Sequence, residues 1–160
     1  MIIKGLLDED FVNYHIPSMF IASSICDWKC CTEFGKSVTM CQNSSLATSK
    51  AIQLSADEIF RRYTQNPITH AIVIGGLEPF LQFDEVVEII EYFRDKGVND
   101  NIVIYTGYYP DEVVDKIDKL KRFPNIIVKF GRFVPNSEKR YDDILGVTLA
   151  SKNQYAQRIS

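Results

Sequence analysis

All four cysteines of the chain lie in one short stretch, SSICDWKCCTEFGKSVTMCQN, which runs from Ser23 to Asn43. They are Cys26, Cys30, Cys31 and Cys41, so two of them are adjacent. Thiols at this density can form disulfides, bind zinc or hold an iron–sulfur cluster. The choice among these three chemistries decides what the protein does.

The spacing of the cysteines disfavours the first two chemistries. A bridge between the neighbours Cys30 and Cys31 would be strained, and the remaining disulfide loops would be small. Structural zinc sites usually contain two close pairs of the C-x2-C type. Here three, none and nine residues separate successive cysteines, and neither histidine of the chain lies among them. A zinc-stabilised interaction module stays open as an alternative.

An iron–sulfur cluster fits the spacing better. Cys26 and Cys30 form a C-x3-C pair, and Cys41 follows further along the chain. Three protein ligands on a four-iron cube leave one iron open, and an open position at a metal is where chemistry takes place. Cys31 is then a buried free thiol that behaves as a small apolar residue. It stays open as the second ligand in a C-x4-C pattern.

Composition indicates an ordinary globular protein. A chain of 160 residues is expected to form a single domain, 1–160, in which 134–160 is a loosely patterned C-terminal segment. The net charge of −3 provides no general attraction to nucleic acid or to an anionic membrane. No apolar run approaches the roughly 20 residues of a membrane span. The N-terminal MIIKGLLDEDFVNYH is no signal peptide, so we expect a cytoplasmic protein with reduced thiols.

Strands and helices are expected to alternate along the chain. A capping box at Ser55 and Glu58 starts one helix, which should end before Asn66-Pro67, and Gly97 fits the end of a second. The expected strands are Ile16–Ser24, Thr69–Gly76, Asn101–Gly107 and Asn125–Phe133, with a short one around Gly146–Ala150. The expected helices lie in SADEIFRRYTQ, FDEVVEIIEYFRDKG and PDEVVDKIDKLKRF. The last helix should have Val113, Val114, Ile117 and Leu120 on one face.

This alternation predicts an α/β fold with parallel βαβ units, because the central strands are apolar on both faces. Ligands of such sheets bind beyond the carboxyl ends of the strands. Three elements should meet there: the cysteine loop, GGLEP (Gly75–Pro79) and YTGY (Tyr105–Tyr108). Two glycines let the backbone approach a ligand closely, and Glu78 adds an acid, so a small zwitterion would suit this edge.

Together these motifs resemble the radical S-adenosylmethionine (SAM) enzymes, and most closely the activating proteins of anaerobic ribonucleotide reductases. The family motif is C-x3-C-x2-C, and here ten residues separate Cys30 from Cys41. GGLEP is similar to the family's Gly-Gly-Glu-Pro turn, and YTGY to its Thr-Gly segment. FGRF followed by LASKNQYAQRI is similar to the activators' Asp-Gly-x-Phe and Ser-x-Asn-Gln-Arg patterns.

The resemblance implies a partial parallel (β/α) barrel that holds a [4Fe-4S] cluster and S-adenosyl-L-methionine. It implies that the cluster is held by Cys26, Cys30 and Cys41. It implies that SAM is bound by Met40, Gly75, Gly76, Glu78, Tyr105 and Thr106. Met40 stands where the family usually has an aromatic residue near the adenine. A side chain at Gly76 would then enter the space where backbone and cofactor meet.

The activity that the resemblance implies is reductive cleavage of SAM to a 5′-deoxyadenosyl radical, which abstracts hydrogen from a glycine of a partner enzyme. The implied partners are a glycyl-radical enzyme of the anaerobic ribonucleotide reductase type and a flavodoxin-like electron donor. A small-molecule radical SAM enzyme, such as a 7-carboxy-7-deazaguanine synthase-like protein, stays open, as does a non-enzymatic iron–sulfur electron carrier. Arg132 and Arg140 are interpreted as exposed arginines that could face a partner.

Overall fold

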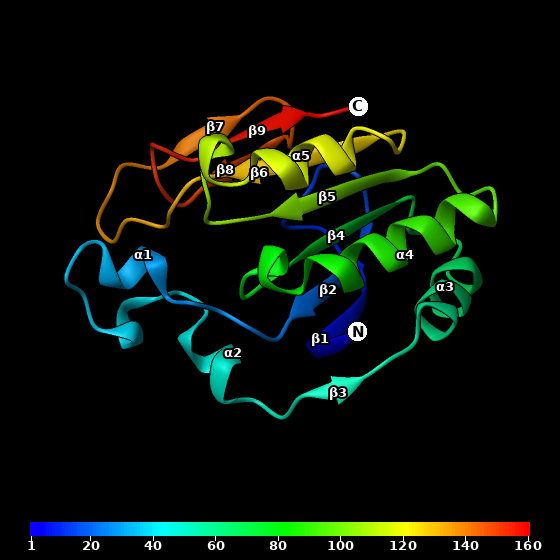
Figure 1. Ribbon diagram of the computed structural model, residues 1–160, viewed down its shortest axis with the longest axis horizontal. Helices are drawn as coiled ribbons and strands as arrows, with labels where there is room; N and C mark the ends of the chain where they lie inside the picture. The colour runs from blue at the N-terminus through cyan, green and yellow to red at the C-terminus, as the bar shows by residue number, and fades with distance from the viewer.

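A seven-stranded sheet runs through the computed structural model, which describes residues 1–160 (Figure 1). The strand order is β3-β1-β2-β4-β5-β6-β9, and β7 and β8 form a separate two-stranded sheet. The strands are β1 (Ile2–Asp10), β2 (Ser18–Ser23), β3 (Ile52–Gln53), β4 (Ala71–Gly76), β5 (Asn101–Tyr105), β6 (Ile126–Phe130), β7 (Arg140–Asp142), β8 (Val147–Leu149) and β9 (Tyr155–Arg158).

The centre of the sheet is parallel and its margins are antiparallel. β2, β4, β5 and β6 pair in parallel, whereas β1 runs antiparallel to β2 and to β3, and β9 runs antiparallel to β6. The prediction of a single α/β domain with a mainly parallel sheet is confirmed. The sheet does not close, because β3 and β9 are its two edges and do not pair with each other. The structure therefore shows an open sheet rather than a closed barrel.

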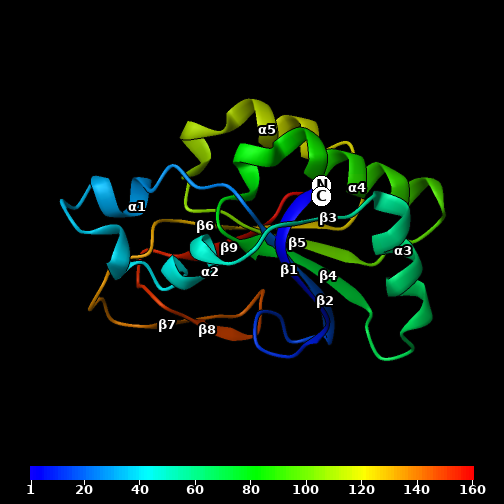
Figure 2. The ribbon, with the colours of Figure 1, turned by 90° about the horizontal axis from the view of Figure 1, so that it is seen from below.

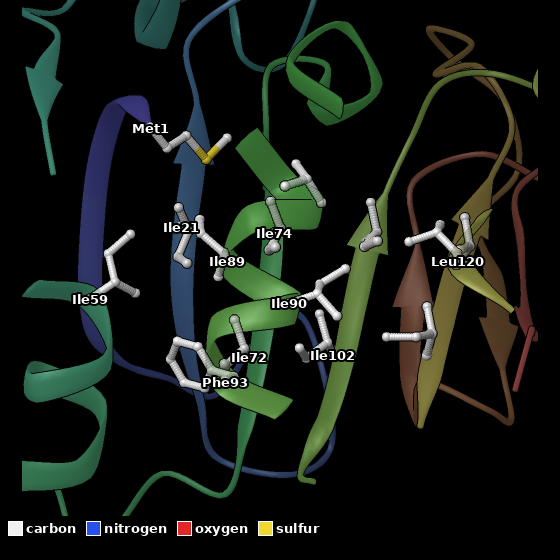
Figure 3. Packing of buried hydrophobic residues seen from close by; sticks show 14 of the residues in the cluster. Met1, Ile21, Ile59, Ile72, Ile74, Ile89, Ile90, Phe93, Ile102 and Leu120 are labelled. Carbon is white, nitrogen blue, oxygen red and sulfur yellow. The ribbon is translucent and has the colours of Figure 1, made fainter. Parts of the chain in front are cut away.

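Three helices cover one face of this sheet (Figure 2). They are α3 (Ala56–Gln65), α4 (Phe83–Asp95) and α5 (Val114–Leu120). The short helical turns η2 (Pro79–Gln82) and η3 (Pro110–Glu112) precede α4 and α5. In Figure 3, Ile89, Ile90 and Phe93 of α4 lie against strand residues such as Ile72 and Ile74. Burial of these side chains is the main driving force that holds helices and sheet together.

The opposite face of the sheet packs against the loop after β1 and against the segment that contains β7 and β8 (Figure 2). Strand residues two apart, such as Ala71 and Val73, contribute to this second core together with Tyr14, Leu145 and Leu149. Their neighbours Ile72 and Ile74 point toward the helices, because side chains along a strand alternate between faces. Both faces of the central strands are therefore covered, as their apolar sequences predicted.

Local signals predicted the helix ends well. The Ser55–Glu58 capping box is present, and α3 ends at Gln65 before Asn66-Pro67. Gly97 has a φ of +80° after α4, a conformation that favours glycine. The third helix differs from its prediction, since its first turn is the 3-10 turn η3 and Val114 is 53 % exposed.

The two ends of the chain contain more strand than the sequence suggested. β1 was not predicted, although its nine residues pair with both β2 and β3. The expected short strand near Gly146 is confirmed as β8. The rest of 134–160 is no loose tail, because it also provides β7 and the edge strand β9. None of the helices is long and apolar enough to cross a membrane.

The cysteine segment follows β2 and lies beyond one end of the sheet (Figures 1 and 2). It contains α1 (Lys29–Thr32), the 3-10 turn η1 (Val38–Met40) and α2 (Ser44–Thr48). Helices this short are marginal on their own, so contacts with the rest of the fold must hold them in place.

We expect Ile90→Ala to lower the free energy of unfolding by about 3 kcal/mol, because it removes a fully buried side chain and leaves a cavity between α4 and the sheet. Val114→Ala is the matched control: this exposed side chain should change stability by about 0.5 kcal/mol or less. Urea unfolding followed by circular dichroism measures both. Equal losses for the two variants would contradict the assigned core.

Candidate functional site

A cavity of about 270 Å³ lies at the carboxyl ends of the parallel strands. The three elements expected at this edge all contribute to its wall. Its lining residues include Cys26, Cys30 and Cys41, Phe20, Asn43, Gly75, Gly76, Glu78, Tyr105, Thr106, Lys129, Gly131 and Gln154. Parallel strands place the residues that follow them at a common edge, and this brings together segments far apart in sequence.

Three of the four cysteines line this cavity: Cys26, Cys30 and Cys41. Cys31 is only 3 % exposed and does not line it, although its sulfur lies 3.9 Å from that of Cys30. All four thiols are free, so no disulfide competes for them. Adjacent residues of the short helix α1 point in different directions, so only Cys30 of the two neighbouring thiols lines the cavity.

Two of the cavity thiols accept backbone hydrogen bonds. The Trp28 N–H lies 3.3 Å from the sulfur of Cys26, and the Asn43 N–H lies 3.4 Å from that of Cys41. Trp28 reaches this position with a φ of +60°, which is uncommon for a residue other than glycine. Hydrogen bonds to sulfur stabilise thiolates and tune iron–sulfur clusters, so the backbone here is arranged for cluster ligands.

The proton affinities of the three thiols also differ. Burial raises the pKa of Cys26 to about 11. The interaction of the Cys30 side chain with that of Cys41, together with burial, raises the pKa of Cys30, and the same interaction lowers the pKa of Cys41 to about 6. Metal ligation requires thiolates, so loading a cluster must release protons from this set.

The three thiols fit a four-iron cluster in both number and chemistry. No group of three or more His, Cys, Asp or Glu side chains is arranged to hold one metal ion. That observation concerns single ions, whereas a cluster takes each thiolate on a different iron. Cys26, Cys30 and Cys41 would hold the cluster, and one of its four irons would have no protein ligand.

The glycine turn forms a second wall of the cavity, and an added side chain would meet different neighbours at its two glycines. Gly75 lies between Phe20 and Tyr105, which both line the cavity; an added Cβ would lie 3.1 Å from the Phe20 ring. Gly76 has a φ of +83°, and an added Cβ would lie 2.8 Å from the Cα of Ala22. The expectation that a side chain at Gly76 would enter the cofactor space is therefore wrong, because it would collide with the backbone of β2.

The turn is fastened to the cysteine segment by side-chain hydrogen bonds. The Asn43 amide donates to the Gly76 carbonyl at 2.6 Å, and the Ser23 hydroxyl donates to the Gly75 carbonyl at 2.8 Å. Asn43 also follows Cys41 closely in sequence, so one residue links a cluster ligand to the turn. Asn43 was not among the predicted site residues, because no motif marks this role.

Glu78 is buried and fully bonded to the protein. Its carboxylate accepts hydrogen bonds from the Phe80 N–H at 3.0 Å, from the Thr106 hydroxyl at 2.8 Å and from the Gly107 N–H at 2.8 Å. Burial raises the pKa of Glu78, and these hydrogen bonds oppose that rise. Glu78 therefore caps η2 and joins the turn after β4 to the turn after β5, which fixes the shape of the cavity wall.

Met40 is the one predicted cofactor residue that the structure does not bring to the cavity. It ends the 3-10 turn η1, all of whose residues are exposed or partly exposed, and it is itself 46 % exposed. Tyr105 and Thr106 do line the cavity, and the Tyr105 hydroxyl donates to the Asn13 carbonyl at 2.5 Å.

Lys129 also lines the cavity, although it was not among the predicted site residues. It is 6 % exposed, and its ammonium donates to the Gly131 carbonyl at 3.1 Å and lies 5.7 Å from the centre of the Tyr105 ring. Burial lowers the pKa of Lys129 to about 8. The signal was present in the sequence, since Lys129 is the only charged residue of the strand Ile126–Phe130. A buried cation beside three thiols points to an anionic ligand group.

Arg132 was interpreted as exposed, and the structure corrects this. Its side chain is 2 % exposed and ion-paired with Glu33 and Glu112, whereas Arg140 is exposed as expected. Arg132 lies two residues after the end of β6, and its ion pair with Glu33 brings it against the cysteine segment, which sequence periodicity could not show.

Residues 18–155 match the family described as a 4Fe-4S single cluster domain. Because this match includes all four cysteines and most of the chain, the protein belongs to that family. No curated protein matches the chain significantly. The membership supports a [4Fe-4S] cluster as the cofactor, in agreement with the three thiols that converge on the cavity.

The pair Cys30 and Cys31 offers a matched test of the ligand set. Cys30→Ala should lose most of the iron of the anaerobically reconstituted protein, whereas Cys31→Ala should keep about the wild-type content, because only Cys30 lines the cavity. Iron and sulfide assays per chain measure this. The double variant removes any rescue by the nearby Cys31 thiol. Retention of iron by Cys30→Ala and its loss in Cys31→Ala would establish the C-x4-C ligand set instead.

Proposed function

We propose that this protein is a radical SAM enzyme that reductively cleaves S-adenosylmethionine and abstracts a hydrogen atom from a glycine of a partner enzyme. The observation that carries the proposal is the convergence of three thiols, a glycine turn and one buried lysine on a single cavity. A four-iron cluster with one open iron, when bound and reduced, supplies an electron that breaks a C–S bond of the SAM sulfonium, and methionine is released.

The residues of the chain would bind and orient SAM next to that open iron. The Lys129 ammonium is the cationic group in the cavity wall and suits the SAM carboxylate. The faces of Phe20 and Tyr105 beside Gly75 provide apolar surface for the rest of the molecule. Glu78, whose carboxylate is occupied by three protein donors, would shape the wall rather than contact SAM.

The choice of a glycyl-radical partner is supported by the C-terminal segments that resemble the activating proteins. The Gln154 amide donates to the Gly131 carbonyl at 3.3 Å, and the Asn153 amide donates to the Arg132 carbonyl at 2.9 Å. FGRF and SKNQ, which are far apart in sequence, are thus packed together beside the cavity. We propose an anaerobic ribonucleotide reductase as the partner and a flavodoxin-like protein as the electron donor.

The reaction is tested with anaerobically reconstituted protein. It should contain about four irons and four sulfides per chain and, after chemical reduction, convert SAM to methionine and 5′-deoxyadenosine. Added glycyl-radical reductase should then give the electron paramagnetic resonance signal of a glycyl radical, and a Gly→Ala variant of the acceptor glycine should not. A reduced cluster that leaves SAM intact would reject the enzyme and favour the electron carrier. SAM cleavage without a glycyl radical would favour a small-molecule substrate.

Binding of SAM is tested separately at Lys129. Lys129→Gln should weaken SAM binding by about 2 kcal/mol, roughly 30-fold in Kd, because one partner of a desolvated ion pair is lost. Lys139→Gln is the control, since it removes the same charge from an exposed position. Titration of SAM into both cluster-loaded variants measures the Kd, with iron content as the check on assembly. Equal affinities would place the SAM carboxylate elsewhere.

A further inference from the structure

Arg132, which is itself buried, uses all its donors on one ionic cluster whose carboxylates are partly exposed. Its Nε and Nη2 donate to the two carboxylate oxygens of Glu33 at 2.9 and 2.7 Å. Its Nη1 and Nη2 donate to those of Glu112 at 2.6 and 2.7 Å, and Nη1 also donates to the Gly107 carbonyl at 2.6 Å. A guanidinium has five N–H groups, so none is left for a partner outside the protein.

The same ionic cluster holds the segment 27–33, which carries Cys30, one of the three proposed ligands of the iron–sulfur cluster. Glu33 follows α1 directly, and Lys29 at the start of α1 donates to Glu112 at 2.6 Å. The Tyr108 hydroxyl donates to Asp27 at 2.6 Å. These contacts are the only hydrogen bonds that join 27–33 to elements beyond the cysteine segment. The position of Cys30 within α1 therefore depends on this set of charged side chains.

Arg132 also lies close to the thiols themselves. A small cavity of about 30 Å³ has Cys26, Cys30, Tyr108 and Arg132 together in its wall. It lies on the side of the thiols where the charged side chains are, because Asp27 and Lys29 line it as well. A cation held here, with little exposure to water, acts on the cluster potential more strongly than a surface charge would.

We propose that Arg132 is a positioning residue of the cluster, which fixes α1 and the Cys26–Cys30 pair and whose charge raises the reduction potential of the cluster. A nearby positive charge favours the reduced state, which carries one more electron, and a nearby negative charge disfavours it. The inference rests on the [4Fe-4S] cluster and is independent of SAM cleavage. The proposed function and this proposal therefore fail in different experiments.

Two substitutions separate the effect of charge from that of position. Arg132→Gln removes a positive charge, and Glu112→Gln removes a negative charge from the same ionic cluster. Both should loosen α1, so a chelator should remove iron several-fold faster from both variants. Their potentials should move in opposite directions, more negative for Arg132→Gln and less negative for Glu112→Gln. A purely structural role would move both potentials the same way.

The experiment uses reconstituted holoprotein in an anaerobic redox titration followed by electron paramagnetic resonance, with iron release to a chelator measured in parallel. Arg140→Gln is the matched control, because Arg140 is exposed and forms no ion pair, and it should match wild type in both measurements.

Arg132→Lys keeps the charge but cannot make five hydrogen bonds, so it should release iron faster at a nearly unchanged potential. If Arg132→Gln does not fold, Arg132→Lys and Glu112→Gln still decide the question. Wild-type iron release, or potentials that shift in the same direction, would overturn the proposal.

Discussion

The fold depends on the burial of both faces of the central strands β4, β5 and β6. One face carries Ile72, Ile74 and Ile102 against the helices, and the other carries Val73 and Val103 against the loop after β1 and the C-terminal segment. Because β2, β4, β5 and β6 are parallel, their carboxyl ends lie at the same end of the sheet, and the covered faces leave that end open for a site. That constraint creates the edge at which the cysteine segment, the glycine turn and Lys129 meet.

The two buried cations at this edge, Lys129 and Arg132, have different hydrogen-bond partners. Inside the cavity, Lys129 faces the thiols with a single protein acceptor and leaves donors for a ligand. On the other side of the cysteine loop, Arg132 is saturated by carboxylates and a carbonyl. The first cation is suited to binding, and the second to holding a loop whose own helices are too short to be stable alone. The two residues are separated by only three positions in the chain.

Local patterns predicted most elements because their causes are local. The capping box at Ser55 and the glycine at position 97 act within one helical turn, and the apolar runs of β4 and β5 need no partner to be recognised. β1 and β9 were not predicted, because polar residues interrupt both strands and their apolar residues alternate weakly. Val114 was placed on the buried face, but the 3-10 turn before α5 rotates it into solvent.

For the site, the sequence alone determined the available groups: four thiols in one loop and a double-glycine turn follow from residue type, and the spacing of the thiols favours an iron–sulfur cluster over zinc. Only the tertiary structure decided which groups act together. It separated Cys30 from Cys31, left Met40 at the surface, placed Lys129 in the cavity and buried Arg132 beneath the loop. Residue type sets what a side chain can do, whereas its direction and exposure depend on contacts between segments that are distant in sequence.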